Sequence, residues 1–156
     1  MGPRAEGAPP KSTTCLGDWS ANLLIVGRQQ LVLAVSNVTL LPVLLPAAPF
    51  KTLPSRVHQA VGAILHALAI DPKRVATELS AMRESFVAST NDRRVLGSMN
   101  DFDRMLGSYL DGRALLDVAL HLAEAPCGPI GMASPNDETV KVLSAPFLRL
   151  VEREAR

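Results

Sequence analysis

An uncharged stretch from Gln29 to Phe50 restricts the folds that are open to this chain. Its 22 residues are enough to cross a bilayer as one helix. However, Ser36 and Asn37 interrupt the stretch, and prolines stand at positions 42, 46 and 49. A polar turn and several prolines break a helix, whereas β-branched residues favour strands. We therefore predict two strands joined by a tight turn, and no membrane span.

These strands would belong to a small sheet that begins earlier in the chain. Short apolar runs between turn residues predict strands at Asn22 to Val26, Gln30 to Val35 and Thr39 to Leu45. Their connections are too short for a parallel crossover, so the three strands form an antiparallel meander. Pro42 cannot donate a hydrogen bond to a neighbour, which places the third strand at an edge or gives it a bulge. Phe86 to Ala88 is a candidate fourth strand at the sheet edge.

The remaining segments have the apolar spacing of helices. A helix is expected from about Pro54 to Ala69, and a second from Pro72 to about Arg83, with Asp71 as its N-cap. A third extends to Tyr109, a fourth contains Leu115 to Leu122, and Ser134 opens a short fifth. The predicted fold class is α+β, a small antiparallel sheet of three or four strands packed against four or five helices.

The start of the third helix is ambiguous in the sequence. Thr90 or Asn91 could cap it, which leaves Gly97 inside the helix as a close-packing point. Alternatively, Ser98 could cap it, with Asp101 three residues later in a variant of the capping box. The sequence is compatible with both starts of this helix.

The length of 156 residues fits one domain. We expect a disordered leader at residues 1–14, a single globular domain at 15–150 and a frayed tail at 151–156. The leader has no apolar signal segment, which predicts a cytoplasmic location. The net charge of +1 argues against a broad surface for nucleic acid or for an anionic membrane.

The segment from Thr90 to Phe102 concentrates polar side chains where structural signals are also strong. Arg93 and Arg94 beside a helix start could hold a phosphate or carboxylate, because the free N–H groups there favour negative charge. Nearby amides, hydroxyls and carboxylates, and polar groups leading into the first strand, could complete the site. The candidate binding residues are Asp18, Asn22, Asn91, Arg93, Arg94, Ser98, Asn100 and Asp101. 

A structural interpretation of the same residues is open as well. In it, Ser98 and Asp101 cap a helix, and the arginines pair with Asp92, Asp101 or Asp103. Trp19 would cover an end of the core while Asp18 or Asn22 bonds a turn.

No catalytic, metal or cofactor site is predicted. His58 and His66 lie eight residues apart on one expected helix, too far to share a metal ion. Cys127 has no adjacent basic residue that would lower its pKa. Cys15 and Cys127 match no metal-binding spacing and are expected to be thiols.

Several segments resemble an uncharacterised bacterial domain family, a domain of unknown function. They are the Trp-Ser-Ala-Asn-Leu sequence from Trp19, Thr39 to Pro42, and the Arg-Arg-Val-Leu-Gly-Ser-Met-Asn-Asp-Phe sequence from Arg93. Glu124 to Gly131 resembles a Glu-x-Pro-Cys-Gly-Pro-x-Gly element of part of the family. The similarity covers about Leu16 to Ala145. The resemblance implies a bacterial α+β domain and implies no activity.

Three function classes follow. The first is a non-catalytic binding or regulatory module whose surface at 91–101 recognises an anionic small molecule or a protein partner. The second is a small enzyme acting on an anionic small molecule, which lacks a recognisable nucleophile and base. The third, a nucleic-acid-associated protein, is disfavoured by the near-neutral charge. An exposed sheet edge is compatible with a homodimer.

Overall fold

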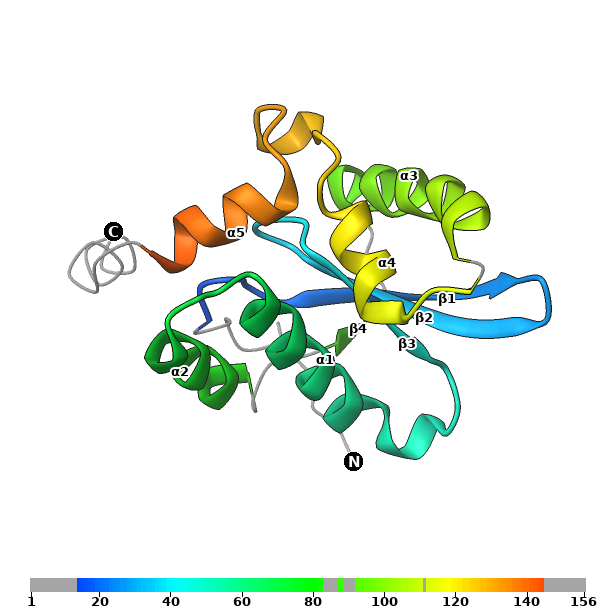
Figure 1. Cartoon of the computed structure of the whole chain (residues 1–156), viewed down its shortest axis with the longest axis horizontal. Helices are drawn as coiled ribbons and strands as arrows, with labels where there is room; N and C mark the ends of the chain where they lie inside the picture. Colours follow the sequence, from blue (N-terminus) through cyan, green and yellow to red (C-terminus); the bar gives the residue numbers. More distant parts are fainter. Residues whose placement is uncertain (1–13, 83–86, 89–91, 111, 145–156) are drawn as a thin grey trace, which may run out of the picture.

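The computed structural model describes residues 14–82, 87–88, 92–110 and 112–144. A four-stranded sheet of order β3-β2-β1-β4 forms the centre of the molecule (Figure 1). The strands are β1 (Trp19–Val26), β2 (Gln29–Ser36), β3 (Pro42–Pro46) and β4 (Val87–Ala88). The first three are antiparallel neighbours, as predicted, whereas the short β4 runs parallel to β1 beside Trp19 and Ser20.

Two strand boundaries differ from the prediction. β1 begins at Trp19 rather than Asn22, because Trp19 is buried and Ser20 donates a hydrogen bond to Asn37 Oδ1 at 2.7 Å. β3 begins at Pro42 rather than Thr39, because the chain is still turning at Leu40, whose φ is 63°. Pro42 opens a strand at the edge of the sheet, which confirms the edge position inferred from its missing donor.

Within the described residues, five α-helices and two short 3-10 helices accompany the sheet, which confirms the α+β class. The α-helices are α1 (Leu53–Ala67), α2 (Pro72–Met82), α3 (Arg93–Tyr109), α4 (Leu115–Leu122) and α5 (Pro135–Leu143). The 3-10 helices are η2 (Phe50–Thr52) and η3 (Gly128–Ile130). Within the described residues, no helix is long and apolar enough to cross a membrane. The expected leader and tail lie almost wholly outside these residues.

Two of the helix starts follow the predicted capping chemistry. The side chain of Asp71 accepts a hydrogen bond from the Lys73 N–H at 2.9 Å before α2. Ser134 accepts one from the Asp137 N–H at 3.1 Å before α5. Each oxygen satisfies a backbone donor that the first turn of a helix leaves free.

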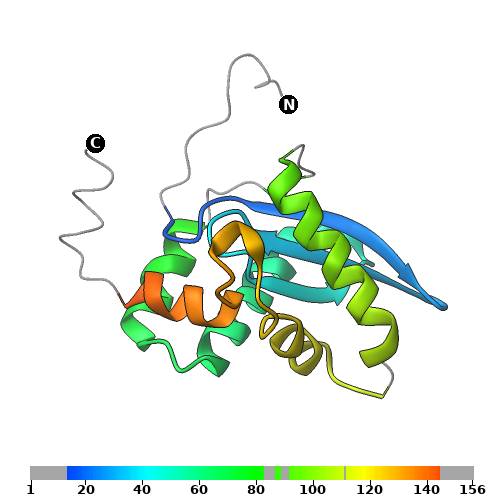
Figure 2. The same cartoon turned by 90° about the horizontal axis from the view of Figure 1, so that it is seen from above.

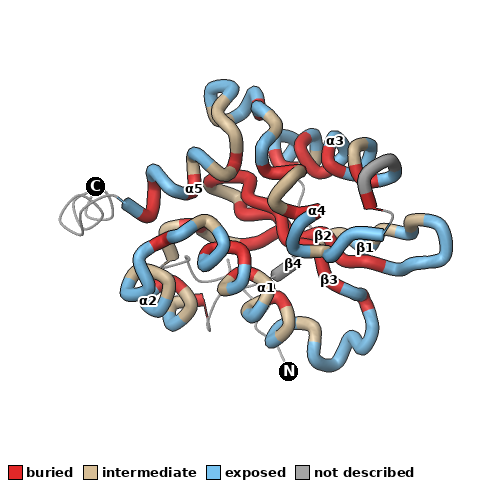
Figure 3. The backbone as a smooth tube through the Cα atoms, viewed as in Figure 1, coloured by how far each residue is buried: buried red, intermediate tan, exposed pale blue. Residues whose placement is uncertain are grey.

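The helices cover the sheet from both sides. α3 lies across β1 and β2 on one side, and α1 lies on the other, while α4 contacts β3, α1 and α3 (Figures 1 and 2). The middle strand β2 is buried from Leu31 to Ser36, which confirms that both of its faces are covered. Burial decreases towards the turn between β1 and β2, which projects from the body of the molecule (Figure 3).

A set of buried hydrogen bonds ties the segment before β1 to the rest of the fold. The Glu78 carboxylate of α2 accepts the N–H groups of Cys15 and Leu16 at 3.0 and 3.1 Å. The Ser36 hydroxyl donates to the Leu16 carbonyl at 2.7 Å and accepts the Thr39 N–H at 3.1 Å. Thr139 of α5 donates to the Thr39 hydroxyl at 2.9 Å. These polar groups therefore connect the segment before β1 to α2, to the turn between β2 and β3 and to α5.

Candidate functional site

The polar segment singled out in the sequence forms the first half of α3. Asp92 caps the helix, with its carboxylate accepting the Arg94 N–H at 2.9 Å. This result supports the earlier of the two predicted starts and shows that the Ser98 cap is wrong, since Ser98 lies inside the helix. Gly97 is inside the helix too, but it is no close-packing point, because a Cβ there would meet nothing within 4 Å.

An open hollow of about 330 Å³ lies along this part of α3. Most of its lining comes from residues that the sequence nominated, with one contribution from the η3 loop. The lining residues are Arg93, Arg94, Gly97, Ser98, Asn100, Asp101, Arg104 and Pro129. Three arginines and one aspartate give this hollow a local positive charge, although the whole chain is close to neutral.

The three arginines of the hollow differ in their partners. Arg94 donates to the Asn37 carbonyl at 2.6 Å and pairs with Asp92 at 3.6 Å. Arg104 hydrogen-bonds to Asp101 one turn away. Arg93 is exposed and has no hydrogen-bond or ion-pair partner among the described residues. Arg93 is therefore the guanidinium of the hollow that is available to a ligand.

Pro129, which lies in the same loop as Cys127, contributes to the lining of the hollow. The loop is folded back on itself, because the Cys127 N–H donates to the Ala133 carbonyl at 3.0 Å. Burial raises the pKa of the Cys127 thiol, and the negative charge of Asp101 raises it further, while a hydrogen bond with Ser98 opposes both effects. The thiol is thus protonated at neutral pH, which makes it a poor nucleophile.

Cys127 and Ser98 lie close together in the structure, although they belong to two separate segments of the sequence. The element from Glu124 to Gly131 and the segment from Arg93 to Phe102 were both noted for their resemblance to family motifs. Here Ser98 is 5% exposed and interacts with the Cys127 thiol. The Ser98 side chain therefore lies beside the thiol of the loop, in addition to lining the hollow.

Two further candidate residues, Asp18 and Asn22, do not line the hollow. Asp18 is half-buried, and its carbonyl accepts the Asn37 N–H at 2.9 Å, so Asn37 lies between Asp18 and Arg94. Asn22 sits in β1 opposite Leu33. Asn91 falls outside the described residues. The structure therefore connects Asp18 to the arginine segment through Asn37, and places Asn22 apart from the hollow.

Asn37 and Arg104 are the residues that the sequence did not nominate. Asn37 was recognised only as part of a turn, and its contact with Arg94 spans 57 positions. Arg104 follows Asp101 by three residues on a helix, a spacing that places two side chains on one face. That spacing is the signal that could have included Arg104 in the candidate site.

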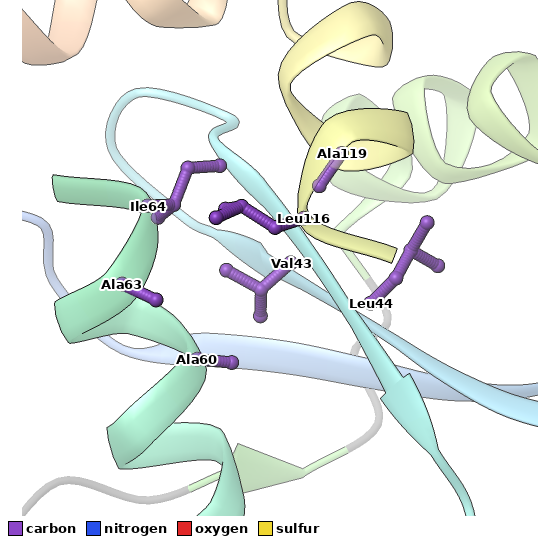
Figure 4. Close-up of a pocket in the computed structure, with 7 residues that line it drawn as sticks. All are labelled: Val43, Leu44, Ala60, Ala63, Ile64, Leu116 and Ala119. Carbon is purple, nitrogen blue, oxygen red and sulfur yellow. The ribbon is translucent and has the colours of Figure 1, made fainter. Parts of the chain in front are cut away.

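A second, smaller pocket has a different character. It holds about 50 Å³ between α1, β3 and α4, and its lining side chains are all apolar (Figure 4). Leu116 reaches from α4 towards Ile64 of α1, and Val43 of β3 points towards α1. Such a pocket has no polar group that could orient or transform a ligand. Among the described residues, no group of three or more His, Cys, Asp or Glu side chains could hold a metal ion.

Comparison with known proteins places the chain in a family. A family model described as a domain of unknown function, DUF6933, matches residues 1–138, which is most of the chain. The chain therefore belongs to that family, and the resemblance to an uncharacterised domain family is confirmed. No curated protein and no solved structure matches the chain.

Proposed function

We propose that this DUF6933 protein is a non-catalytic binding or regulatory module that holds an anionic small molecule in the α3 hollow. The observation that carries the proposal is Arg93, which has no partner in the described part of the chain and lies beside two further arginines. An arginine binds phosphate or carboxylate through two parallel hydrogen bonds. A position in the first turn of a helix adds the favourable field of the helix dipole.

The size of the hollow supports a small ligand. Its volume of about 330 Å³ is at the lower end of the range for small-molecule sites, which is roughly 300–1,000 Å³. Asn100 is exposed and lines the same hollow, where its amide could donate to a second oxygen of the anion. The chain as a whole is close to neutral, which favours a compact anion over a long polyanion such as nucleic acid.

Catalysis on the same anion is the alternative, and it has less support. A hydrolase or transferase needs a nucleophile or base next to the ligand. Cys127 is held as a neutral thiol, and Asp101 is engaged by Arg104. We also propose a bacterial, cytoplasmic setting, which the family resemblance supports and in which the thiols of Cys15 and Cys127 would stay reduced.

Native mass spectrometry of the gently purified protein tests this function. We expect an added mass that is lost on denaturation and is absent from the Arg93→Ala protein. Arg28→Ala is the matched control, because Arg28 is exposed in the turn between β1 and β2 and does not line the hollow. 

Two results would contradict the proposal. The first is a native mass spectrum in which the wild-type protein carries no ligand, either as purified or after incubation with phosphate or citrate. The other is an added mass that Arg93→Ala retains. Circular dichroism melting of both variants establishes that a lost ligand does not reflect a lost fold.

A further inference from the structure

We propose that the open part of β1 pairs with β1 of a second copy of this chain, so that two sheets join into one. This inference is independent of the anion site, because it rests on the sheet edge rather than on α3. The pairing would use the residues from Asn22 to Val26 in antiparallel orientation. 

The outer edge of β1 is only partly covered. β4 pairs with Trp19 and Ser20 alone, near the start of the strand. From Ala21 to Val26, no strand among the described residues lies on that side, and the outward backbone groups have no partner in the described part of the chain. Unpaired N–H and C=O groups in a row are a template for another strand.

The other edge of the same sheet is protected. β3 begins and ends with prolines, Pro42 and Pro46, and both α1 and α4 pack against it. Proline and a covering helix are two of the means by which proteins prevent edge pairing. The stretch from Trp19 to Val26 has neither a proline nor a charged residue.

The open edge also carries exposed apolar side chains. Leu23 is 51% and Ile25 is 70% exposed, and alternation along the strand places both on the same face of the sheet. Both side chains lie on the projecting hairpin of β1 and β2, which is largely exposed (Figure 3). An isolated exposed apolar residue is ordinary, but a pair on an unpaired strand is typical of an interface.

The strand is complementary to itself. Antiparallel pairing centred on Leu24 places Leu23 opposite Ile25 of the partner subunit, and Asn22 opposite Val26 of the partner subunit. At the centre of the pairing, from Leu23 to Ile25, apolar side chains thus meet apolar side chains, which stabilises a pair of neighbouring strands. No like charges meet between the two strands, since the paired segment is uncharged.

The charges at the ends of this pairing are complementary. Arg28 is exposed in the turn after β1, whereas Asp18 directly precedes β1. Antiparallel pairing therefore brings these opposite charges to the same end of the contact. A two-fold axis perpendicular to the sheet creates this approach twice and leaves both α3 helices on the same face of the joined sheet.

The small size of the contact predicts a reversible dimer. Five residues from each copy bury less than the roughly 1,200 Å² of a stable standard interface. We therefore expect the fraction of dimer to depend on protein concentration. 

Sedimentation velocity over a concentration series tests the pairing. The mass of the wild-type protein should rise from 16.7 kDa towards twice that value. Leu23→Lys and Ile25→Glu should each remain monomeric, because each places a charge against an apolar side chain of the other copy. An equimolar mixture of the two variants should form a dimer again, since the register places the new opposite charges face to face.

Met132→Lys is the matched control, because Met132 is 63% exposed and lies in the loop after η3. This variant should associate as the wild-type protein does. Three results would overturn the proposal: a wild-type monomer at every concentration up to about 1 mM, a dimer that withstands both β1 substitutions, or a mixture that stays monomeric. The unchanged melting temperature of each variant verifies that it folds.

Discussion

The turn between β2 and β3 and the outward face of α3 are both rich in polar groups, but they use them differently. Around the turn, the Ser36 hydroxyl is buried and bonded to Leu16 and Thr39. On α3, Arg93 and Asn100 are exposed and line a hollow. The first group stabilises the fold, whereas the second has no structural task among the described residues, which is why it is the better place to look for a ligand.

Two neighbouring arginines show the same contrast within one helical turn. Arg94 reaches back to the Asn37 carbonyl at the β2–β3 turn, at 2.6 Å. Arg93 points to no such group among the described residues. Both residues are arginines, so their different partners result from their different positions on the helix. A double substitution of both would therefore mix a structural effect with a binding effect.

The largest expected effect is a loss of stability at the buried turn between β2 and β3. Ser36→Ala should lower the free energy of unfolding by about 3 kcal/mol, because the Leu16 carbonyl, the buried Thr39 N–H and the half-buried Val38 N–H lose their partner. Chemical denaturation followed by circular dichroism measures it. Ser80→Ala, at an exposed position on α2, is the control and should have almost no effect. A Ser36→Ala protein as stable as the control would mean that the buried set does not hold the fold.

The buried Glu78 gives a second, pH-dependent effect. Burial raises the pKa of its carboxyl above the ordinary value of 4.5, although hydrogen bonds from Cys15 and Leu16 act in the opposite direction. The folded chain therefore binds this proton more tightly than the unfolded chain. The stability that this proton contributes is fully present below the pKa of Glu78 in the unfolded chain. It is lost as the pH rises through the pKa of Glu78 in the folded chain.

Thermal melts of the wild-type protein and of Glu78→Gln at several pH values check this sign. The melting temperature of the wild type, relative to the variant, should fall as the pH is raised from about 4.5 towards neutral. A relative rise would show that the N–H groups stabilise the carboxylate more than burial destabilises it.

A smaller loss of stability is expected at the N-cap of α3, which lies next to the turn between β2 and β3. Asp92→Ala should cost about 1 kcal/mol, because the Arg94 N–H loses its acceptor. Asp92→Asn keeps an oxygen in that position and should restore most of the loss. If the two variants unfold at the same denaturant concentration, the cap is not what starts the helix.

The sequence predicted those features that depend on local spacing. The helices were placed within about two residues, because their apolar periodicity, Asp71 and Ser134 are local signals. The edge position of β3 followed from Pro42 alone. β1 was placed three residues late, since Trp19 and Ser20 join the strand through tertiary contacts that no local pattern contains.

The candidate site was predictable only in part, for the same reason. Six of the residues that line the hollow lie within the segment from Thr90 to Phe102, so their grouping followed from their proximity in the chain. The contributions of Pro129 and Cys127 depend on a loop that folds back from about 30 positions later. Which arginine is engaged and which is available depends on Asn37, which is distant in sequence.

Isothermal titration with pyrophosphate at constant ionic strength tests most directly whether the α3 hollow is an anion site. We predict saturable binding to the wild-type protein, a loss of at least about tenfold in affinity for Arg93→Ala, and wild-type affinity for Arg28→Ala. The melting temperature of Arg93→Ala without ligand should equal that of the wild type, because Arg93 has no partner among the described residues. Equal binding by the wild-type and Arg93→Ala proteins, or binding lost to the same extent in Arg28→Ala, would contradict the assignment of the site.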